Sequence, residues 1–92
     1  MKFEWDQEKN LINQKKHKIS FETAAYAFQD ENYIEMYDFE HSTEEDRYIA
    51  IGCVGEVLFV VFIERKENIR LISARLATES ERRLYYDQNI YY

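Results

Sequence analysis

The sequence has few of the residues on which small binding loops and metal centres are commonly built. It contains no proline and only two glycines, Gly52 and Gly55, so a glycine-rich phosphate loop is excluded. Cys53 is the one cysteine, which excludes an internal disulfide and leaves a cysteine-based zinc site short of ligands. The longest apolar run, residues 57–63, is too short to cross a bilayer, and residues 1–6 lack the apolar stretch of a signal peptide. We therefore expect a protein of the cytoplasm that does not contact membranes.

Apolar and aromatic side chains are plentiful by contrast. Hydrophobic residues make up 46% and aromatic residues 16% of the 92 residues, a composition that excludes a disordered chain. The length allows one hydrophobic core, and no linker, repeat or low-complexity segment divides it. We therefore expect one domain that spans residues 1–92.

The chain is acidic overall, but its charge is unevenly distributed. The formal net charge is -6, and residues 29–46 carry eight acidic side chains with no Lys or Arg. Without that segment, 12 basic and 10 acidic side chains remain, a net charge of +2. The basic side chains gather in residues 9–18 and 65–83. Two interpretations stay open: the basic stretches are solvated surfaces, or they meet in the fold and bind an anion.

Two helices are predicted near the start of the chain. Asp6 is a candidate N-cap, because its carboxylate can accept hydrogen bonds from the first free backbone amides of a helix over Gln7–Lys16. Ser20 is a second N-cap candidate. The apolar residues that follow are spaced at i, i+3, i+4 and i+7 and form one face of a helix: Phe21, Ala24, Ala25 and Phe28.

A β-rich pattern after position 47 predicts an antiparallel meander, preceded by a weakly indicated strand over 33–39. The predicted strands and turns are Tyr48–Val54, a two-residue turn at Gly55–Glu56, Val57–Ile63, a polar turn at Arg65–Asn68 and Ile69–Leu76. Thr78 and Glu81 match the capping box of a short last helix that ends near Tyr86. Two N-terminal helices, an antiparallel sheet and a short C-terminal helix make the predicted fold class α+β.

Arginine side chains on the meander are the candidate phosphate contacts, because a guanidinium matches phosphate oxygens in a two-point fork. Neighbouring strands lie about 5 Å apart, so arginines distant in sequence can share one surface. The candidates are Arg47, Arg65, Arg70 and Arg75. Strict alternation along the last strand predicts one face with Ile69, Leu71, Ser73 and Arg75, and the other with Arg70, Ile72, Ala74 and Leu76. Alternatively, the arginines form surface ion pairs that need no function, with Glu44, Glu45, Glu64 and Glu67.

The two histidines allow fewer conclusions. His17 and His41 are too few soft ligands for a closed metal site, although a site of His, Asp and Glu stays open. Ser42 beside His41 is too close in sequence to imply the geometry of a Ser-His-Asp hydrolase. His17 ends a lysine-rich helix, either as a solvent-facing or capping residue or as a phosphate contact.

Four groups of short motifs cover nearly the whole chain. They are Phe3-Glu-Trp-Asp6 with Lys9, Asn13 and Lys16-His17; Ser20-Phe21-Glu22 with Ala24 and Phe28; His41-Ser42 with Glu45, Arg47 and Ile51-Gly52; and Arg70-Leu-Ile-Ser-Ala-Arg75 with Ala77-Thr78, Glu81-Arg82 and Tyr85. Each motif alone is weak, but the last block after a W-D-x-x-K start is fairly specific. In these motifs and their order, the chain resembles the BrnT family of bacterial toxins.

The resemblance implies a fold, an activity and a partner. BrnT proteins are the toxins of type II toxin–antitoxin systems; they have a compact fold similar to that of RelE-type ribonucleases, and they cut RNA. Their partner is BrnA, a ribbon-helix-helix antitoxin that covers the toxin and binds operator DNA, so that the complex represses its own operon. We therefore expect a ribonuclease that inhibits translation, needs no cofactor and assembles as a heterotetramer through an antitoxin dimer.

RNA cleavage of this kind needs groups that stabilise phosphoryl charge and move protons, and fixed cations can replace a metal ion. The expected catalytic residues are Arg65 and Arg75 as clamps with Arg47 beside them, and Glu45 or His41 as the base. The expected RNA-binding residues are Lys16, His17 and Arg70.

The acidic balance of the chain is unusual for an RNA-cutting toxin, which is expected to be basic. Residues 29–46 either face a basic partner or mark a protein that has lost catalysis. The alternative function is therefore a non-catalytic partner and co-repressor of a DNA-binding antitoxin. The tail, 87–92, matches no family motif, and packing onto the domain is favoured over a partner contact.

Overall fold

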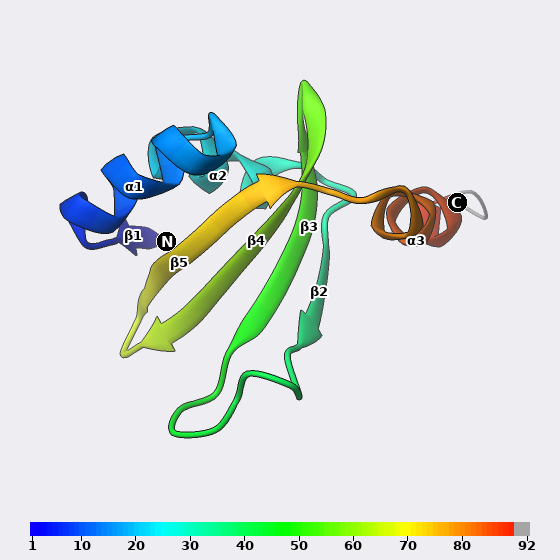
Figure 1. Cartoon of the computed structure of the whole chain (residues 1–92). Coiled ribbons are helices and arrows are strands. Elements are labelled where there is room, and N and C mark those ends of the chain that lie inside the picture. Colours follow the sequence, from blue (N-terminus) through cyan, green and yellow to red (C-terminus); the bar gives the residue numbers. More distant parts are fainter. Residues whose placement is uncertain (90–92) are drawn as a thin grey trace.

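A five-stranded mixed sheet with helices on both faces is the framework of the protein (Figure 1). The structure, a computed structural model, describes residues 1–89. Its elements are β1 (Lys2–Glu4), α1 (Gln7–His17), α2 (Phe21–Ala25), the 3-10 helix η1 (Tyr26–Gln29), β2 (Ile34–Tyr37), β3 (Tyr48–Val54), β4 (Glu56–Arg65), β5 (Asn68–Leu76) and α3 (Glu79–Asn89). The strand order is β1-β5-β4-β3-β2, in which β2 to β5 are antiparallel and β1 is parallel to β5. The predicted α+β class is confirmed.

The helices begin where their capping residues predict. The Asp6 side chain accepts hydrogen bonds from the first amides of α1, and Ser20 Oγ accepts from the amide of Thr23 in α2. The capping box of α3 is also present: the amide of Thr78 donates to Glu81 Oε1 over 2.8 Å, and the amide of Glu81 donates to Thr78 Oγ1 over 3.3 Å. The helix ends were less predictable. α3 continues to Asn89 rather than Tyr86, and residues 90–92 of the predicted tail lie outside the described part of the chain.

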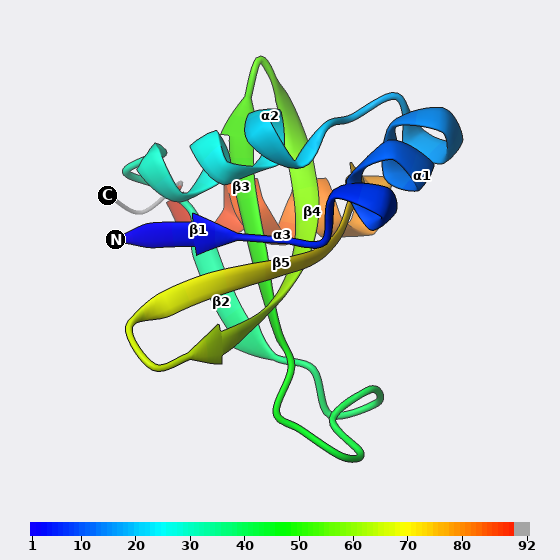
Figure 2. The ribbon, with the colours of Figure 1, turned by 90° about the vertical axis from the view of Figure 1, so that its left-hand side faces the viewer.

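The main core lies between the sheet and the first helices, on the face opposite α3 (Figure 2). It contains Phe21 and Phe28 from the helices, and Phe62 and Leu71 from the sheet. Two buried asparagines attach α1 to its neighbours, because an amide can satisfy several backbone groups at once. Asn13 Nδ2 donates to the carbonyls of Ile19 and Ala74, each over 2.8 Å, and Asn13 Oδ1 accepts from the amide of Ala74. Asn10 Oδ1 accepts from the amide of Phe21.

Gly52 lies in β3 and Gly55 directly follows this strand, and each position suits glycine for a different reason. Val54 pairs with Glu56, so Gly55 alone joins β3 to β4, with a φ of 74° that suits glycine. The predicted two-residue turn is therefore wrong, because Glu56 already belongs to β4. At Gly52 a side-chain carbon would lie 2.5 Å from the carbonyl oxygen of Ala27, so only glycine lets η1 pack this closely on β3.

Two features of the sheet differ from the predicted meander. β1 was not predicted: it has three residues, and it pairs with β5 more than sixty positions away, which no local pattern encodes. In β5, Ile72 is an extra residue between two paired positions, a β-bulge. The bulge reverses the alternation. Leu71 and Ala74 both lie in the helix-side core, whereas Arg70 and Arg75 both oppose odd-numbered residues of β4 and share the other face. The predicted separation of these two arginines is wrong.

Candidate functional site

A cleft of about 370 Å³ opens on the face of the sheet that carries α3. Its floor is made by side chains that lie side by side across three strands: Ile49 of β3 pairs with Val61 of β4, and Val61 pairs with Ser73 of β5. The segment after β2 forms one wall and the start of α3 the other. The lining residues are Asp38, Glu40, His41, Ile49, Phe59, Val61, Ser73, Arg75 and Glu81. Floor and walls thus combine an apolar surface with titratable side chains, the composition that is usual for active sites.

Arg75 is the one cation from Arg or Lys among the described lining residues of the cleft. Its guanidinium lies 4.0 Å above the ring of Phe59, the residue with which it pairs across the strands. Glu81 receives two hydrogen bonds from it, Nη1 to Oε1 over 2.8 Å and Nη2 to Oε2 over 3.0 Å. These bonds raise the pKa of Arg75, and the same bonds, with those from Thr78, lower the pKa of Glu81. The pair is therefore charged at all physiological pH values.

His41 and Asp38 form a second pair at the opposite wall. His41 Nδ1 lies 3.0 Å and 3.2 Å from the two carboxylate oxygens of Asp38. The side chain of Asp38 is 9% exposed and that of His41 is 61% exposed. When the carboxylate is ionised it only accepts hydrogen bonds, so Nδ1 is then the donor, and in a neutral ring Nε2 keeps a lone pair. In this tautomer Nε2 is the ring nitrogen that can accept a proton.

Local sequence explains why His41 is held in this position. Ser42 Oγ donates to the carbonyl of Asp38 over 2.6 Å and accepts from the amide of Arg47 over 2.8 Å. The amide of Asp38 donates to the carbonyl of Arg47 over 2.8 Å. These bonds close the loop 38–47 at its base, where short polar side chains commonly replace strand pairing.

Arg65 and Arg70 are on the same face as Arg75 but are not cleft-lining residues. Arg70 Nη1 donates to Glu4 over 2.9 Å, and Arg65 lies 3.8 Å from Glu45. Arg70 is five residues from Arg75 along β5, roughly 15 Å away at the usual rise per residue, too far for both to hold one phosphate. Both arginines form ion pairs, and the pairing of Arg65 with Glu45 matches the predicted structural alternative.

The remaining predicted residues are distributed around the molecule. Lys16 and His17 lie in the last turn of α1, which packs on the opposite face of the sheet (Figure 2). Arg47 precedes β3 and contributes its backbone to the loop. Glu45 pairs with Arg65 outside the cleft. Of the eight predicted site residues, therefore, the fold places only His41 and Arg75 in one cleft.

Asp38 and Glu81 are the two cleft residues that pair with His41 and Arg75, and sequence analysis did not assign them to the site. Asp38 was counted only as part of the acidic segment, although its spacing of three residues from His41 was a usable signal. Glu81 was identified as a capping residue, which it is, but its second role depends on the docking of α3. That docking is made by Tyr85, which is 5% exposed and packs with Ile51, Val57 and Ala77.

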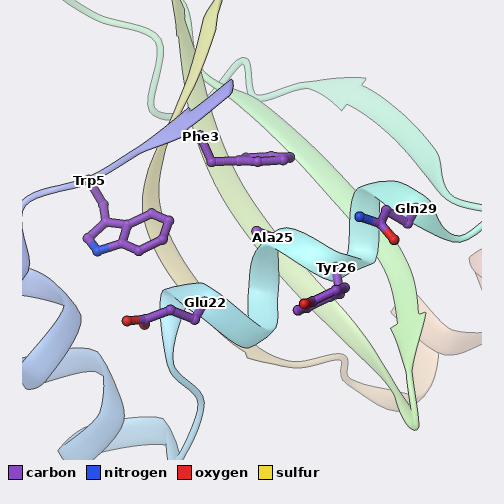
Figure 3. A pocket seen from close by; sticks show the side chains of 6 residues that line it. All are labelled: Phe3, Trp5, Glu22, Ala25, Tyr26 and Gln29. Carbon is purple, nitrogen blue, oxygen red and sulfur yellow. The ribbon is translucent and has the colours of Figure 1, made fainter. Parts of the chain in front are cut away.

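A second hollow lies on the helix side of the molecule, between β1 and α2 (Figure 3). Its volume is about 320 Å³, and it is lined by Phe3, Trp5, Glu22, Ala25, Tyr26 and Gln29. The rings of Phe3 in β1 and of Trp5 after it lie on one side of the hollow, and the ring of Tyr26 in η1 lies on the other (Figure 3). Its one carboxylate, that of Glu22, accepts a hydrogen bond from Asn10 Nδ2 over 2.8 Å. This hollow therefore offers an apolar surface rather than groups for chemistry.

The described residues also limit other kinds of site. Within residues 1–89, no three or more His, Cys, Asp and Glu side chains are grouped so that they could hold a metal ion. Among the helices of the same residues, none is long and apolar enough to span a bilayer.

Comparison with known proteins gives one informative result. A search of curated proteins found no match. The family model described as the ribonuclease toxin, BrnT, of type II toxin–antitoxin systems matches residues 5–81, which is most of the chain and includes every residue that lines the cleft. The chain therefore belongs to the BrnT family of ribonuclease toxins of type II toxin–antitoxin systems.

Proposed function

We propose that the cleft is the active site of a metal-independent endoribonuclease that inhibits translation. The observation that carries this proposal is the pair of His41 and Arg75 at one cleft, each held by a carboxylate. A proton acceptor and a fixed cation are the two groups that RNA cleavage by the ribose hydroxyl requires. Family membership supports the ribonuclease class in general, and the assignment of residues is ours.

In the proposed reaction, Nε2 of His41 accepts the proton of the 2′-hydroxyl. The 2′-oxygen attacks the adjacent phosphorus, a new P–O2′ bond forms, and the P–O5′ bond breaks. The leaving 5′-oxygen takes a proton from the imidazolium or from water. Arg75 stabilises the negative charge that builds on the phosphoryl oxygens, and Asp38 stabilises the imidazolium. The products are a 2′,3′-cyclic phosphate and a 5′-hydroxyl.

The other predicted residues have secondary roles in this proposal. Arg65 and Arg70 lie on the same face, both toward the turn between β4 and β5, and would contact phosphates on one side of the cut, once these displace Glu45 and Glu4. Of the two predicted bases, His41 is favoured, because Glu45 lies outside the cleft. Catalytic participation of Arg47, RNA contacts of Lys16 and His17, and a RelE-like relationship stay predictions.

The partner that family membership implies is an antitoxin, and we propose a ribbon-helix-helix protein similar to BrnA. It would form a heterotetramer through its own dimer, bring operator DNA to the complex and act in the cytoplasm. The acidic loop 38–47 supports this proposal, because it forms a wall of the cleft and carries Phe39, which is 85% exposed. A basic partner with an apolar contact would suit this loop and cover the cleft.

The alternative is a non-catalytic partner and co-repressor. It is favoured by the net charge of -6 and by the two hydrogen bonds that Arg75 already donates to Glu81. Under this alternative, Arg75 is a structural residue that attaches α3 to β5.

The test uses the antitoxin-free protein with naked RNA in excess EDTA, compared with His41→Gln and Arg75→Ala. Arg83→Ala is the matched control, because Arg83 forms an exposed ion pair on α3 away from the cleft. New RNA ends with cyclic phosphates, produced by the wild type and the control but by neither cleft variant, would support the proposal. Cleavage by all four proteins would refute the residue assignment. Intact RNA in all four would favour the co-repressor.

A further inference from the structure

The hydrogen bonds of Arg75 leave one edge of its guanidinium for a ligand. A guanidinium has five N–H donors, two on each terminal nitrogen and one on Nε. Nη1 uses both of its donors, one to Glu81 over 2.8 Å and one to the carbonyl of Leu76 over 3.2 Å. Nη2 uses one donor, to Glu81 over 3.0 Å. Within the described residues, the second donor of Nη2 and the donor of Nε have no partner, and these two are parallel on one side of the group.

Glu81 is itself held in place, so the edge of Arg75 that donates to Glu81 cannot rotate toward the cleft. Glu81 Oε1 also accepts from the amide of Thr78 over 2.8 Å. The ring of Phe59 covers one flat side of the guanidinium at 4.0 Å. α3, which carries Glu81, is anchored one turn later by the buried Tyr85. The carboxylate, the ring and the helix therefore fix the plane and the rotation of Arg75 together.

We propose that Glu81 is a positioning residue that makes Arg75 bind a phosphate group through its Nε–Nη2 edge. This inference rests on the proposed function, because it assumes that the cleft receives a phosphodiester. Two parallel N–H groups match two phosphoryl oxygens, so the remaining edge is sufficient for bidentate binding. Glu81 also offsets the charge of Arg75, which weakens the attraction for the substrate while it fixes the direction of the donors.

The charge of Glu81 and its effect on the orientation of Arg75 should change the kinetics in opposite directions. Kinetic constants can therefore distinguish a positioning residue from a merely structural one. Removing the charge of Glu81 should strengthen phosphate binding, because Arg75 is no longer neutralised. It should also let the guanidinium rotate, and misplaced donors stabilise the transition state poorly. A residue that only blocked the site would lower KM without lowering kcat. A residue that only supported folding would lower the active fraction without changing KM.

The experiment compares Glu81→Gln with Glu79→Gln, the same substitution in the same turn of α3 at an exposed residue that pairs with Arg83. Glutamine keeps the capping box, so the helix start is retained. We expect Glu81→Gln to lower KM about threefold and kcat about tenfold or more, and Glu79→Gln to leave both unchanged. In an Arg75→Ala background, Glu81→Gln should change nothing further. Unchanged kcat in Glu81→Gln, or a further loss without Arg75, would overturn the proposal.

A second readout does not depend on RNA cleavage. Inorganic phosphate is titrated into the protein while the Nε–Hε resonance of Arg75 is followed by NMR. We expect this resonance to move with phosphate in the wild type, and with higher phosphate affinity in Glu81→Gln. A resonance that phosphate does not move would overturn the proposal. If RNA stays intact but the resonance moves, the proposed ribonuclease function fails and the assignment of the phosphate-binding edge stands.

Discussion

The hydroxyl of Tyr85 is the clearest single determinant of how α3 is attached to the sheet. It donates to Asp30 Oδ2 over 2.5 Å, and the same carboxylate accepts from the backbone amides of Cys53 and Asn32. Burial and the nearby Asp30 together raise the pKa of Tyr85, so the phenol stays protonated and able to donate. Tyr85→Phe removes this donor and leaves the ring in place.

The expected cost follows from the type of bond. A hydrogen bond to a charged acceptor contributes about 1.5–3 kcal/mol, and loss of the donor leaves the acceptor only partly satisfied. Asp30 keeps two backbone donors and is partly exposed, so we expect the low end, about 1–2 kcal/mol. For a chain of this size that corresponds to a fall in Tm of about 5–15 °C.

Urea denaturation at pH 7, followed by circular dichroism, measures the change. The matched control is Tyr86→Phe, because Tyr86 is 56% exposed and its ring contacts that of Tyr85 on the same helix. We expect the control to stay within about 0.5 kcal/mol of the wild type. Equal stabilities of Tyr85→Phe and Tyr86→Phe would refute the argument that this bond anchors α3.

The same bond predicts a pH dependence with a definite sign. Burial alone would raise the pKa of Asp30, but the hydrogen bonds from Tyr85, Asn32 and Cys53 lower it below its ordinary value of 3.8. A carboxyl with a lowered pKa in the folded state contributes stability above its unfolded pKa and loses that contribution as the pH falls. The stability difference between wild type and Tyr85→Phe should therefore be constant near neutral pH and shrink below pH 3.8. A difference that grows on acidification would contradict this assignment.

Three further predictions concern the cleft and the core. Arg75→Ala should lower RNA cleavage about 100- to 1,000-fold, measured as initial rates on a labelled oligonucleotide, with RNA binding less affected. His41→Gln should lower the cleavage rate about 100-fold or more, because the proton acceptor is lost; an unchanged rate would exclude His41 as the base. Asn13→Ala should destabilise the fold by about 2–4 kcal/mol in urea, because the amide of Ala74 and two carbonyls lose their partner in the core. A loss under 1 kcal/mol would show that water replaces the asparagine.

Features that depend on near neighbours were predicted correctly. Asp6, Ser20 and Thr78 each cap a helix whose first turn lies within three residues, so local hydrogen bonding determines where these helices begin. The strands of the hairpins were also placed to within a few residues, because short apolar runs bounded by turn residues are typical of buried strands.

The candidate site was predicted only in part, and the reason is the distance between its contributors along the chain. His41 and Arg75 were identified by residue type and by family motifs, but so were arginines and lysines that the fold places elsewhere. A motif carries no information about which of its charged side chains will be neutralised by a partner. Arg70 is an example, because the carboxylate that binds it comes from Glu4 on a strand that was not predicted.

The sequence by itself determined the class of the fold, the helix starts, the family and the residue types available for chemistry. All of these depend on short segments or on composition. Only the tertiary structure decided which of these residues meet. The bulge at Ile72 puts Arg70 and Arg75 on one face, β1 joins β5 across the length of the chain, and the docking of Tyr85 brings Glu81 to Arg75. Each depends on packing between elements far apart in the sequence, where the energies of many weak contacts and not the local backbone preference select the arrangement.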